Sequence, residues 1–173
     1  MNKILKPIAG LLFFTLISCG ENNTKEQNNL ISHEVETVEN SVATREQQTA
    51  PAIQFINEYL QVFSNMTSID DVVDWVLRTE LASENFKQTY YNMITEAYEA
   101  DPIVGLGYDP VLDGQDADTE YELVSYDDES HFLLIRGVNF DYFMTTMKVV
   151  EIDGKWLVDG SGDINIPENQ KPH

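Results

Sequence analysis

The sequence predicts an α+β domain in which three N-terminal helices pack on a curved antiparallel sheet of about four strands. Two observations carry this prediction. Apolar residues recur at steps of three and four between residues 51 and 100, and at steps of two between residues 121 and 159. The first spacing is the helix period and the second is the strand period. Helices followed by strands, without alternation, indicate an α+β domain with its helices on one face of the sheet.

The three helices have recognisable ends. Pro51 suits the first turn of a helix, where its missing N–H would have no partner in any case. Ser68 and Ser83 are good N-caps for the second and third helices. Asp101 ends the third helix, because a proline follows it and the residue before proline disfavours helix. The predicted helices span 51–64, 69–78 and 83–100, with Tyr59 and Tyr90 among the positions of their apolar faces.

A long loop over 101–119 precedes the strands. Strands are predicted over 121–126, 131–136, 144–152 and 155–159. The dipeptide Asp153-Gly154 between the last two suits a type I′ turn, which fixes the register of the hairpin. The predicted pairs are Ile152 with Lys155, Glu151 with Trp156, Val150 with Leu157, Val149 with Val158 and Lys148 with Asp159. Both faces of this hairpin carry apolar side chains, so the second face must be covered, or line a pocket or an interface.

The N-terminus resembles the signal peptide of a bacterial lipoprotein. Lys3 and Lys6 precede a short apolar run, about half the ~20 residues that a spanning helix needs. The run ends in Leu16-Ile17-Ser18-Cys19, which resembles a lipobox, the motif in which the cysteine is acylated after cleavage before it. An ordinary secretory signal and a short buried helix are the alternatives. Lipidation also accounts for the single cysteine of an exported chain.

The sequence therefore divides into four segments. Residues 20–50 contain no aromatic residue and are rich in Glu, Asn, Gln and Thr, a composition typical of disorder. The predicted segments are a signal peptide over 1–18, the lipidated Cys19 with a disordered tether over 19–50, the folded domain over 51–167 and a disordered tail over 168–173. The predicted location is the bacterial cell envelope, at the outer membrane, with the membrane as a partner through the lipid.

The charge of the chain excludes nucleic acid as a partner. Of the 10 Lys and Arg residues, Lys3 and Lys6 leave with the signal peptide, so 8 would remain against 30 Asp and Glu, a net charge near −22. Binding to phosphate groups requires clustered basic side chains that displace counterions. Such a surface repels both nucleic acids and anionic lipid headgroups.

Two segments carry distinctive motifs, one before the first predicted strand and one at the last. Residues 108–116 read Tyr-Asp-Pro-Val-Leu-Asp-Gly-Gln-Asp and contain the element Asp-Pro-x-Leu-x-x-Gln-Asp. Residues 154–160 begin with Gly-Lys-Trp, and Ile-Asn-Ile-Pro follows at 164–167. Together these segments resemble a bacterial family of exported proteins, domain-of-unknown-function family 3828. The resemblance covers about residues 52–167 and implies a cone-like fold of the nuclear-transport-factor-2-like or cystatin-like type. It implies no activity, because a fold does not determine a function.

The densest polar feature lies over 109–129, where nine residues are acidic and none is basic. Carboxylates there could bind Ca²⁺, but the glycine and the closing glutamate of an EF-hand are missing from their positions. We therefore predict turn caps and a solvated edge, with no metal and no cofactor. Gln115 and Asp116 could tie the long loop to strand ends or point into the cone and bind a ligand. The candidate ligand-binding or structural residues are Asp109, Asp113, Gln115 and Asp116.

The functional prediction is a non-enzymatic domain that binds a small molecule, a peptide or a protein. One alternative is a cone-fold enzyme of the isomerase or hydrolase type with an Asp general base in the sheet pocket. Another is a structural component that forms a homodimer through the second sheet face. Residues of the types that such an enzyme uses are Asp113, Asp116, Tyr121, Tyr126, Tyr142 and His131. No nucleophile, base and orienting group form a recognisable set in the sequence, so no catalytic residue is assigned.

Overall fold

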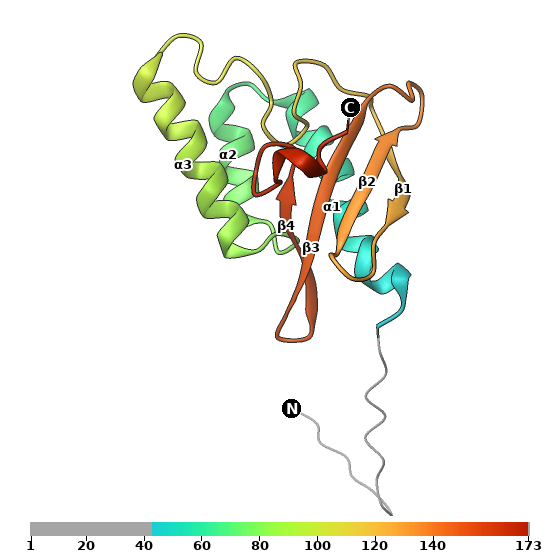
Figure 1. The fold of residues 1–173 in the computed structure, drawn as a ribbon. Helices are drawn as coiled ribbons and strands as arrows, with labels where there is room; N and C mark the ends of the chain where they lie inside the picture. The colour runs from blue at the N-terminus through green and yellow to red at the C-terminus, as the bar shows by residue number, and fades with distance from the viewer. Residues whose placement is uncertain (1–42, 173) are drawn as a thin grey trace, which may run out of the picture. The chain divides into compact units, whose positions relative to one another are not determined.

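The computed structural model describes residues 43–172, and within them the predicted α+β class is confirmed. Four antiparallel strands form one sheet in the order β1-β2-β3-β4 (Figure 1). The elements are α1 (Arg45–Asn65), α2 (Ile69–Arg78), α3 (Glu84–Ala100), β1 (Tyr121–Tyr126), β2 (Phe132–Gly137), β3 (Met144–Ile152), β4 (Lys155–Ser161) and the 3₁₀ helix η1 (Glu168–Gln170). The predicted signal peptide, Cys19 and residues 20–42 of the predicted tether lie outside the described residues.

Helix α1 covers one face of the sheet. It contacts β1, β3 and β4, while α2 packs on α1 and on α3, and α3 reaches β4. Among residues 43–172, no helix has both the length and the apolar character needed to cross a membrane.

Helix α1 begins earlier than the sequence predicts, at Arg45 and not at Pro51. Thr44 and Gln47 form a capping box: the Thr44 hydroxyl accepts from the Gln47 N–H at 3.3 Å, and the Gln47 side chain accepts from the Thr44 N–H at 2.8 Å. Thr49, in this added turn, is buried. Pro51 therefore lies inside the helix, where one missing hydrogen bond is tolerated because the cap and the packing hold the turn.

The β3–β4 hairpin largely follows the predicted register. Asp153 and Gly154 have φ values of 52° and 77°, as a type I′ turn requires, and the pairs from Ile152–Lys155 to Val149–Val158 are confirmed. The predicted pairing of Lys148 with Asp159 is wrong. Lys148 faces Gly160, because a bulge beside Val149 leaves Asp159 as an extra residue. A second bulge lies in β1, and bulges bend and twist a strand, which curves the sheet.

The chain itself covers part of the second face of the sheet. Residues 168–173 are predicted to form a disordered tail, but residues 168–170 form η1. The Thr146 hydroxyl of β3 donates to the Gln170 carbonyl at 2.6 Å. Gln170, Lys171 and Pro172 border a depression over this face together with Leu134. The end of the chain therefore shields apolar surface that would otherwise be open to solvent.

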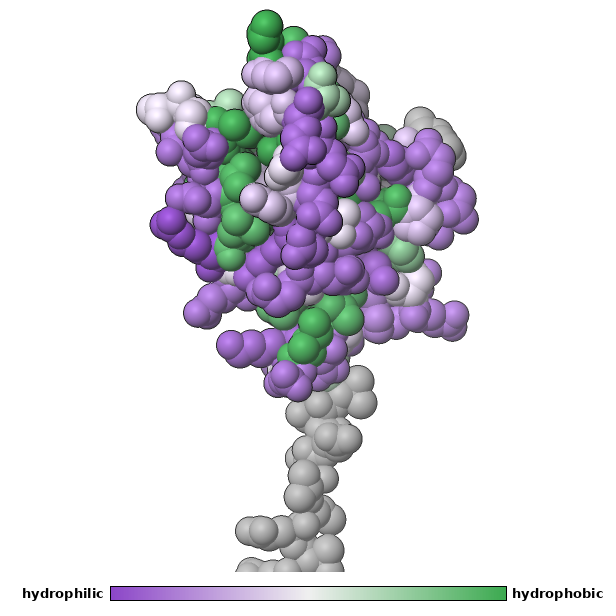
Figure 2. All heavy atoms as spheres, turned by 90° about the vertical axis from the view of Figure 1, so that its left-hand side faces the viewer, coloured by the Kyte–Doolittle hydropathy of each residue, from purple (hydrophilic) through white to green (hydrophobic). Residues whose placement is uncertain are grey.

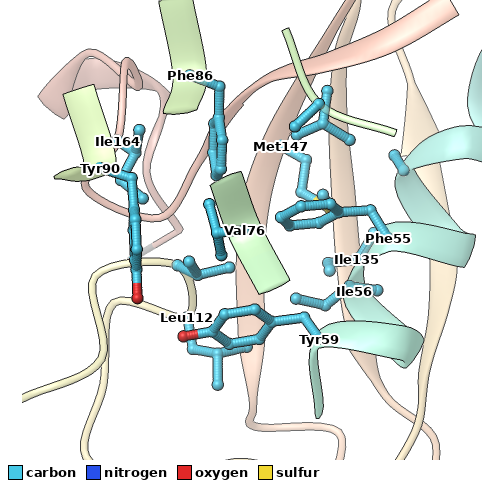
Figure 3. Close-up of a cluster of buried hydrophobic side chains, with 14 of the residues drawn as sticks. Phe55, Ile56, Tyr59, Val76, Phe86, Tyr90, Leu112, Ile135, Met147 and Ile164 are labelled. Carbon is cyan, nitrogen blue, oxygen red and sulfur yellow. The ribbon is translucent and has the colours of Figure 1, made fainter. Parts of the chain in front are cut away.

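The hydrophobic core lies between the helices and the inner face of the sheet. Phe55 of α1 meets Phe86 of α3 edge to face, with ring centroids 5.3 Å apart and an interplanar angle of 84°. The fully buried side chains of this cluster include Phe55, Ile56, Tyr59, Val76, Phe86, Tyr90, Ile135, Met147 and Ile164 (Figure 3). Each buried large apolar side chain contributes about 1.5–3 kcal/mol, so this cluster is the main source of stability.

Candidate functional site

A cavity of about 280 Å³ lies between α1, α3 and the loop over 101–119. Aliphatic side chains of α3 and of the loop form part of its wall. Its aromatic lining consists of Tyr59, Phe63, Tyr90, Tyr98 and Tyr108. The volume is just below the ~300–1,000 Å³ that is typical of small-molecule sites.

The larger hollow between α1 and α2, of about 690 Å³, is a weaker candidate. Its lining includes Glu58, Asp71, Asp74 and Arg78. The Arg78–Asp74 pair there, at 2.8 Å, is largely exposed to solvent on both sides. This hollow is more open than the smaller cavity, and exposed ion pairs of this kind contribute little free energy. We therefore place the candidate site in the smaller cavity.

Asp109 is the polar centre of the cavity. Its Oδ2 accepts a hydrogen bond from the Tyr59 hydroxyl at 2.7 Å. Its Oδ1 accepts from the backbone N–H groups of Val111 at 2.8 Å and Leu112 at 3.1 Å, as in an Asx turn. Burial raises the pKa of the Asp109 carboxyl, although all three hydrogen bonds favour the charged form. The carboxylate is thus held in place by the loop and by α1 at once.

The Tyr90 hydroxyl is the unusual group of the cavity. Tyr90 is fully buried, and its hydroxyl oxygen makes no hydrogen bond of good geometry among residues 43–172, although it lies near enough to the Tyr59 hydroxyl for the two groups to interact. In Figure 3 the hydroxyls of Tyr59 and Tyr90 point toward the same region. Burial, and then the charge of Asp109, raise the pKa of Tyr90 against a smaller opposing effect of the Tyr59 hydroxyl, so Tyr90 stays neutral. Because buried polar groups are nearly always hydrogen-bonded, the Tyr90 hydroxyl has capacity for a partner, which the Tyr59 hydroxyl or a group from outside the chain would supply.

The four candidate residues of the loop do not converge. Asp109 lies inside the cavity, and Gln115 lies at its edge, where its side-chain amide donates to the Gly107 carbonyl at 3.2 Å. Asp113, at a φ of 54°, is exposed, and its carboxylate lies 3.3 Å from the Lys171 ammonium. Asp116 is exposed to solvent. Within residues 43–172 no three acidic, His or Cys side chains are grouped so that they could hold a metal ion.

An ion-pair cluster ties the C-terminal segment to the wall of the cavity. The Tyr108 hydroxyl and the Lys171 ammonium both donate to the Asp163 carboxylate. Lys171 also lies 3.4 Å from Glu168. Burial, and then the hydrogen bond to Asp163, raise the pKa of Tyr108 to about 12. The position of the Tyr108 ring therefore depends on the last residues of the domain.

The side chains that an Asp-dependent enzyme could use lie elsewhere. The Tyr126 hydroxyl and His131 Nδ1 share a hydrogen bond of 2.7 Å at the β1–β2 turn, at the opposite end of the sheet from the long loop (Figure 1). His131 has a φ of 61°, which explains why β2 starts one residue later than predicted. Tyr142, between β2 and β3, is 68% exposed. These groups do not form a common centre with Asp113 or Asp116.

Sequence reasoning did not single out Tyr59 and Tyr90 as site residues. Both entered only as apolar-face positions of the first and third helices. One signal could have identified them: a buried tyrosine normally needs a partner for its hydroxyl. Two such residues on helices that meet one loop indicate a polar centre in that loop.

No family model, curated protein or solved structure matches this chain. The interpretation of the site therefore depends on its own geometry.

Proposed function

We propose that this protein is a lipid-anchored protein of the bacterial envelope, whose folded domain binds a small ligand in the cavity between α1, α3 and the long loop. The observation that supports this proposal is the cavity itself, in which the buried Tyr90 hydroxyl lies beside the Tyr59–Asp109 pair and makes no hydrogen bond of good geometry among residues 43–172. An unpartnered buried hydroxyl costs about 1–3 kcal/mol. The Tyr90 oxygen is closed to solvent in this structure, so a ligand that reaches it must displace neighbouring side chains, and the domain regains that free energy when the ligand supplies the partner.

Binding is better supported than catalysis. A general base must be free to reach a proton of the substrate. Asp109 already accepts three hydrogen bonds, two of them from the backbone of its own turn. Its geometry is that of a structural and binding carboxylate. An enzyme of the Asp-dependent type would have to use Asp109, because Asp113 and Asp116 lie outside the cavity.

Dimerisation through the second sheet face also receives less support. The segment containing η1 covers part of that face, and Lys148 lies over the ring of Phe132 with 5.8 Å between ammonium and centroid. A face that the chain itself covers offers less apolar area to a second copy.

The proposed location follows from the lipobox. Acylation of Cys19 would hold the chain at a membrane, and the segment between Cys19 and Thr44 would link the anchor to the domain. We also propose that the folded domain belongs to family 3828, because residues 108–116 and 154–167 resemble the motifs of that family.

Phenol tests the binding site, since it is small enough for the cavity and can hydrogen-bond to Tyr90 or Asp109. We expect phenol to shift amide resonances of the cavity wall, such as those of Leu106 and Gly107. Replacing Tyr90 with Phe removes one hydrogen bond, about 1 kcal/mol, and should weaken phenol binding about fivefold. The same change should leave the melting temperature unchanged or raise it, because it removes a buried hydroxyl that makes no hydrogen bond of good geometry among the described residues.

Tyr91→Phe is the matched control, because Tyr91 is the neighbouring residue of α3 and is exposed. This variant should bind phenol as the wild type does. Shifts spread over the whole surface, or equal phenol affinity of Tyr90→Phe and the wild type, would contradict the proposed site.

A further inference from the structure

We infer that the ligand of this cavity is a small organic ammonium ion with an aromatic or aliphatic group, an inference that rests on the proposed binding function. The inference depends on the types of residue that line the cavity. Among the described residues that line the cavity, Asp109 is the charged one, and none is Lys, Arg or His. An anionic ligand would meet a carboxylate with no cation to pair with. A cationic ligand would meet the counter-charge that a buried ion requires.

Among the described residues, the ammonium group of Lys171, beside Tyr108 of the cavity wall, is already paired with carboxylates. Tyr108 and Lys171 donate to different oxygens of the Asp163 carboxylate. The Lys171 Nζ also lies close to the carboxylates of Asp113 and Glu168. Three acidic partners surround this one basic group, so its charge is not available to an anion in the cavity. The centre of the site is therefore negative because of Asp109. The edge near Lys171 is not positive, because the carboxylates around Lys171 balance its charge.

The aromatic walls favour a cation as well. The faces of aromatic rings attract ammonium groups, by about 2 kcal/mol when the group is desolvated. Tyr59 and Phe63, one helical turn apart on α1, stack with 6.1 Å between centroids and 16° between planes. On the α3 wall, the loop backbone packs closely against Tyr98, since a Cβ added at Gly105 would lie 2.7 Å from the Tyr98 ring. Both walls are thus held by packing before a ligand binds, which reduces the entropy lost on binding.

The hydrogen-bonding capacity of the cavity matches an ammonium donor. A carboxylate has about four acceptor positions, and Asp109 uses three of them. The oxygen of Tyr90, beside the Tyr59 hydroxyl, is a second acceptor, and it makes no hydrogen bond of good geometry among residues 43–172. An ammonium group carries donors only, so it can donate to both. A neutral alcohol could make similar hydrogen bonds but would leave the charge of Asp109 uncompensated in a buried site.

The apolar part of the ligand has surface to contact. Leu106 and Ile94 line the cavity, and Val104 lines it while remaining 59% exposed. Ile103, beside it, is 92% exposed. Figure 2 shows the helix side of the molecule as mainly hydrophilic, with apolar side chains in a narrow strip, near the bottom and at the top. The top is the end at which this loop lies in Figure 1. The net charge of −20 also attracts cations to the surface.

Three probes that share one skeleton test the inference: 2-phenylethylammonium, 2-phenylethanol and phenylacetate. Their affinities for the full mature chain are measured at pH 7 and constant ionic strength by titration, with amide shifts locating the site. We expect the ammonium ion to bind at least about tenfold more tightly than the alcohol, equal to about 1.4 kcal/mol. Phenylacetate should shift no resonance of the cavity wall.

Two variants separate charge from the aromatic wall. Asp109→Asn should remove the preference for the ammonium ion over the alcohol. Asp109 also stabilises the turn over residues 109–112. If Asp109→Asn does not fold for that reason, Tyr98→Leu tests whether the cavity prefers the ammonium ion. It keeps the carboxylate and should lower ammonium affinity several-fold more than alcohol affinity.

The outcomes distinguish the two proposals. Tighter binding of the ammonium ion, lost or reduced in the variants, supports the inference. If the alcohol or phenylacetate binds in the cavity as tightly as the ammonium ion, the inference is overturned while ligand binding stands. If none of the three probes shifts the cavity wall, the inference is overturned, and the phenol titration alone then decides whether the cavity binds ligands.

Discussion

At the scale of single residues, two buried carboxylates with opposite behaviour organise the long loop. Asp118 accepts hydrogen bonds from the backbone N–H groups of Thr119, Asn139 and Phe140 at 2.6–2.8 Å, and from the Asn139 side chain at 2.8 Å. Burial alone would raise the pKa of Asp118, but these hydrogen bonds lower it to about 2. Asp109 has fewer donors in a deeper site, and burial raises its pKa.

The depressed pKa of Asp118 predicts a loss of stability in acid. The unfolded chain takes up this proton near the ordinary value of 3.8, so the stabilisation is complete above that pH and is lost as the pH falls toward about 2. Asp118→Asn should lower the melting temperature at pH 7, and the difference from the wild type should shrink at pH 3 and again at pH 2.

Melting curves at the three pH values check this prediction. Asp116→Asn is the control, since Asp116 is an exposed residue of the same loop. It should differ little from the wild type throughout. A difference between Asp118→Asn and the wild type that stays constant from pH 7 to pH 2 would show that the hydrogen bonds of Asp118 do not depend on its charge.

At the scale of elements, the loop over 101–119 is held against the end of the sheet by backbone and hydroxyl groups. The Ser161 hydroxyl donates to the Val111 carbonyl, and the Thr145 hydroxyl donates to the Leu112 carbonyl, each at 2.7 Å. The Asp163 N–H donates to the Pro110 carbonyl at 2.8 Å. Gly162, with a φ of 58°, passes directly beside this segment. The shape of the cavity therefore depends on β3 and β4 as well as on the helices.

Gly162→Ala should displace the loop. A Cβ at Gly162 would lie 2.4 Å from the Pro110 carbonyl oxygen and 2.7 Å from that of Val111, and backbone atoms cannot move aside cheaply. A left-handed φ adds about 1–2 kcal/mol. We expect the free energy of unfolding, measured with denaturant, to fall by at least about 3 kcal/mol, within the range for severe local strain.

Gly154→Ala separates the two causes. Gly154 also has a left-handed φ, of 77°, but no atom lies within 4 Å of its added Cβ among the described residues. This variant should lose only the strain of about 1–2 kcal/mol. Equal losses in the two variants would mean that the contact between Gly162 and the loop is not tight.

At the scale of the whole molecule, the proposed function joins an acylated N-terminus to an acidic domain. Cys19→Ser should remove fatty-acid label from the protein and leave the signal peptide uncleaved, as shown by labelling and by mass. Ser18→Ala, which keeps a small residue before the cysteine, should still be labelled. Because Cys19 is the only cysteine, no other thiol can take up the acyl chain. Normal labelling of Cys19→Ser would exclude the anchor.

The fold class and most element bounds could be predicted from the sequence because they follow from local signals. Ser68 and Ser83 precede α2 and α3 as caps, and Asp153-Gly154 forms the predicted turn. Apolar periodicity then decides which face of each element is buried. The predicted start of α1 is wrong because Pro51 is a strong local signal for a first helical turn. In the structure the capping box of Thr44 and Gln47 and the burial of Thr49 extend the helix to Arg45.

What only the tertiary structure decided is the partner of each polar side chain. Asp109, Asp113, Gln115 and Asp116 share one loop in the sequence, but the fold buries the first and leaves Asp113 and Asp116 in solvent. Tyr59 and Tyr90 are far apart in the chain and their positions predict core residues, yet both line the same cavity. Periodicity reports whether a side chain is buried. Which groups meet there depends on the packing of α1, α3 and the loop, to which residues distant in the sequence contribute.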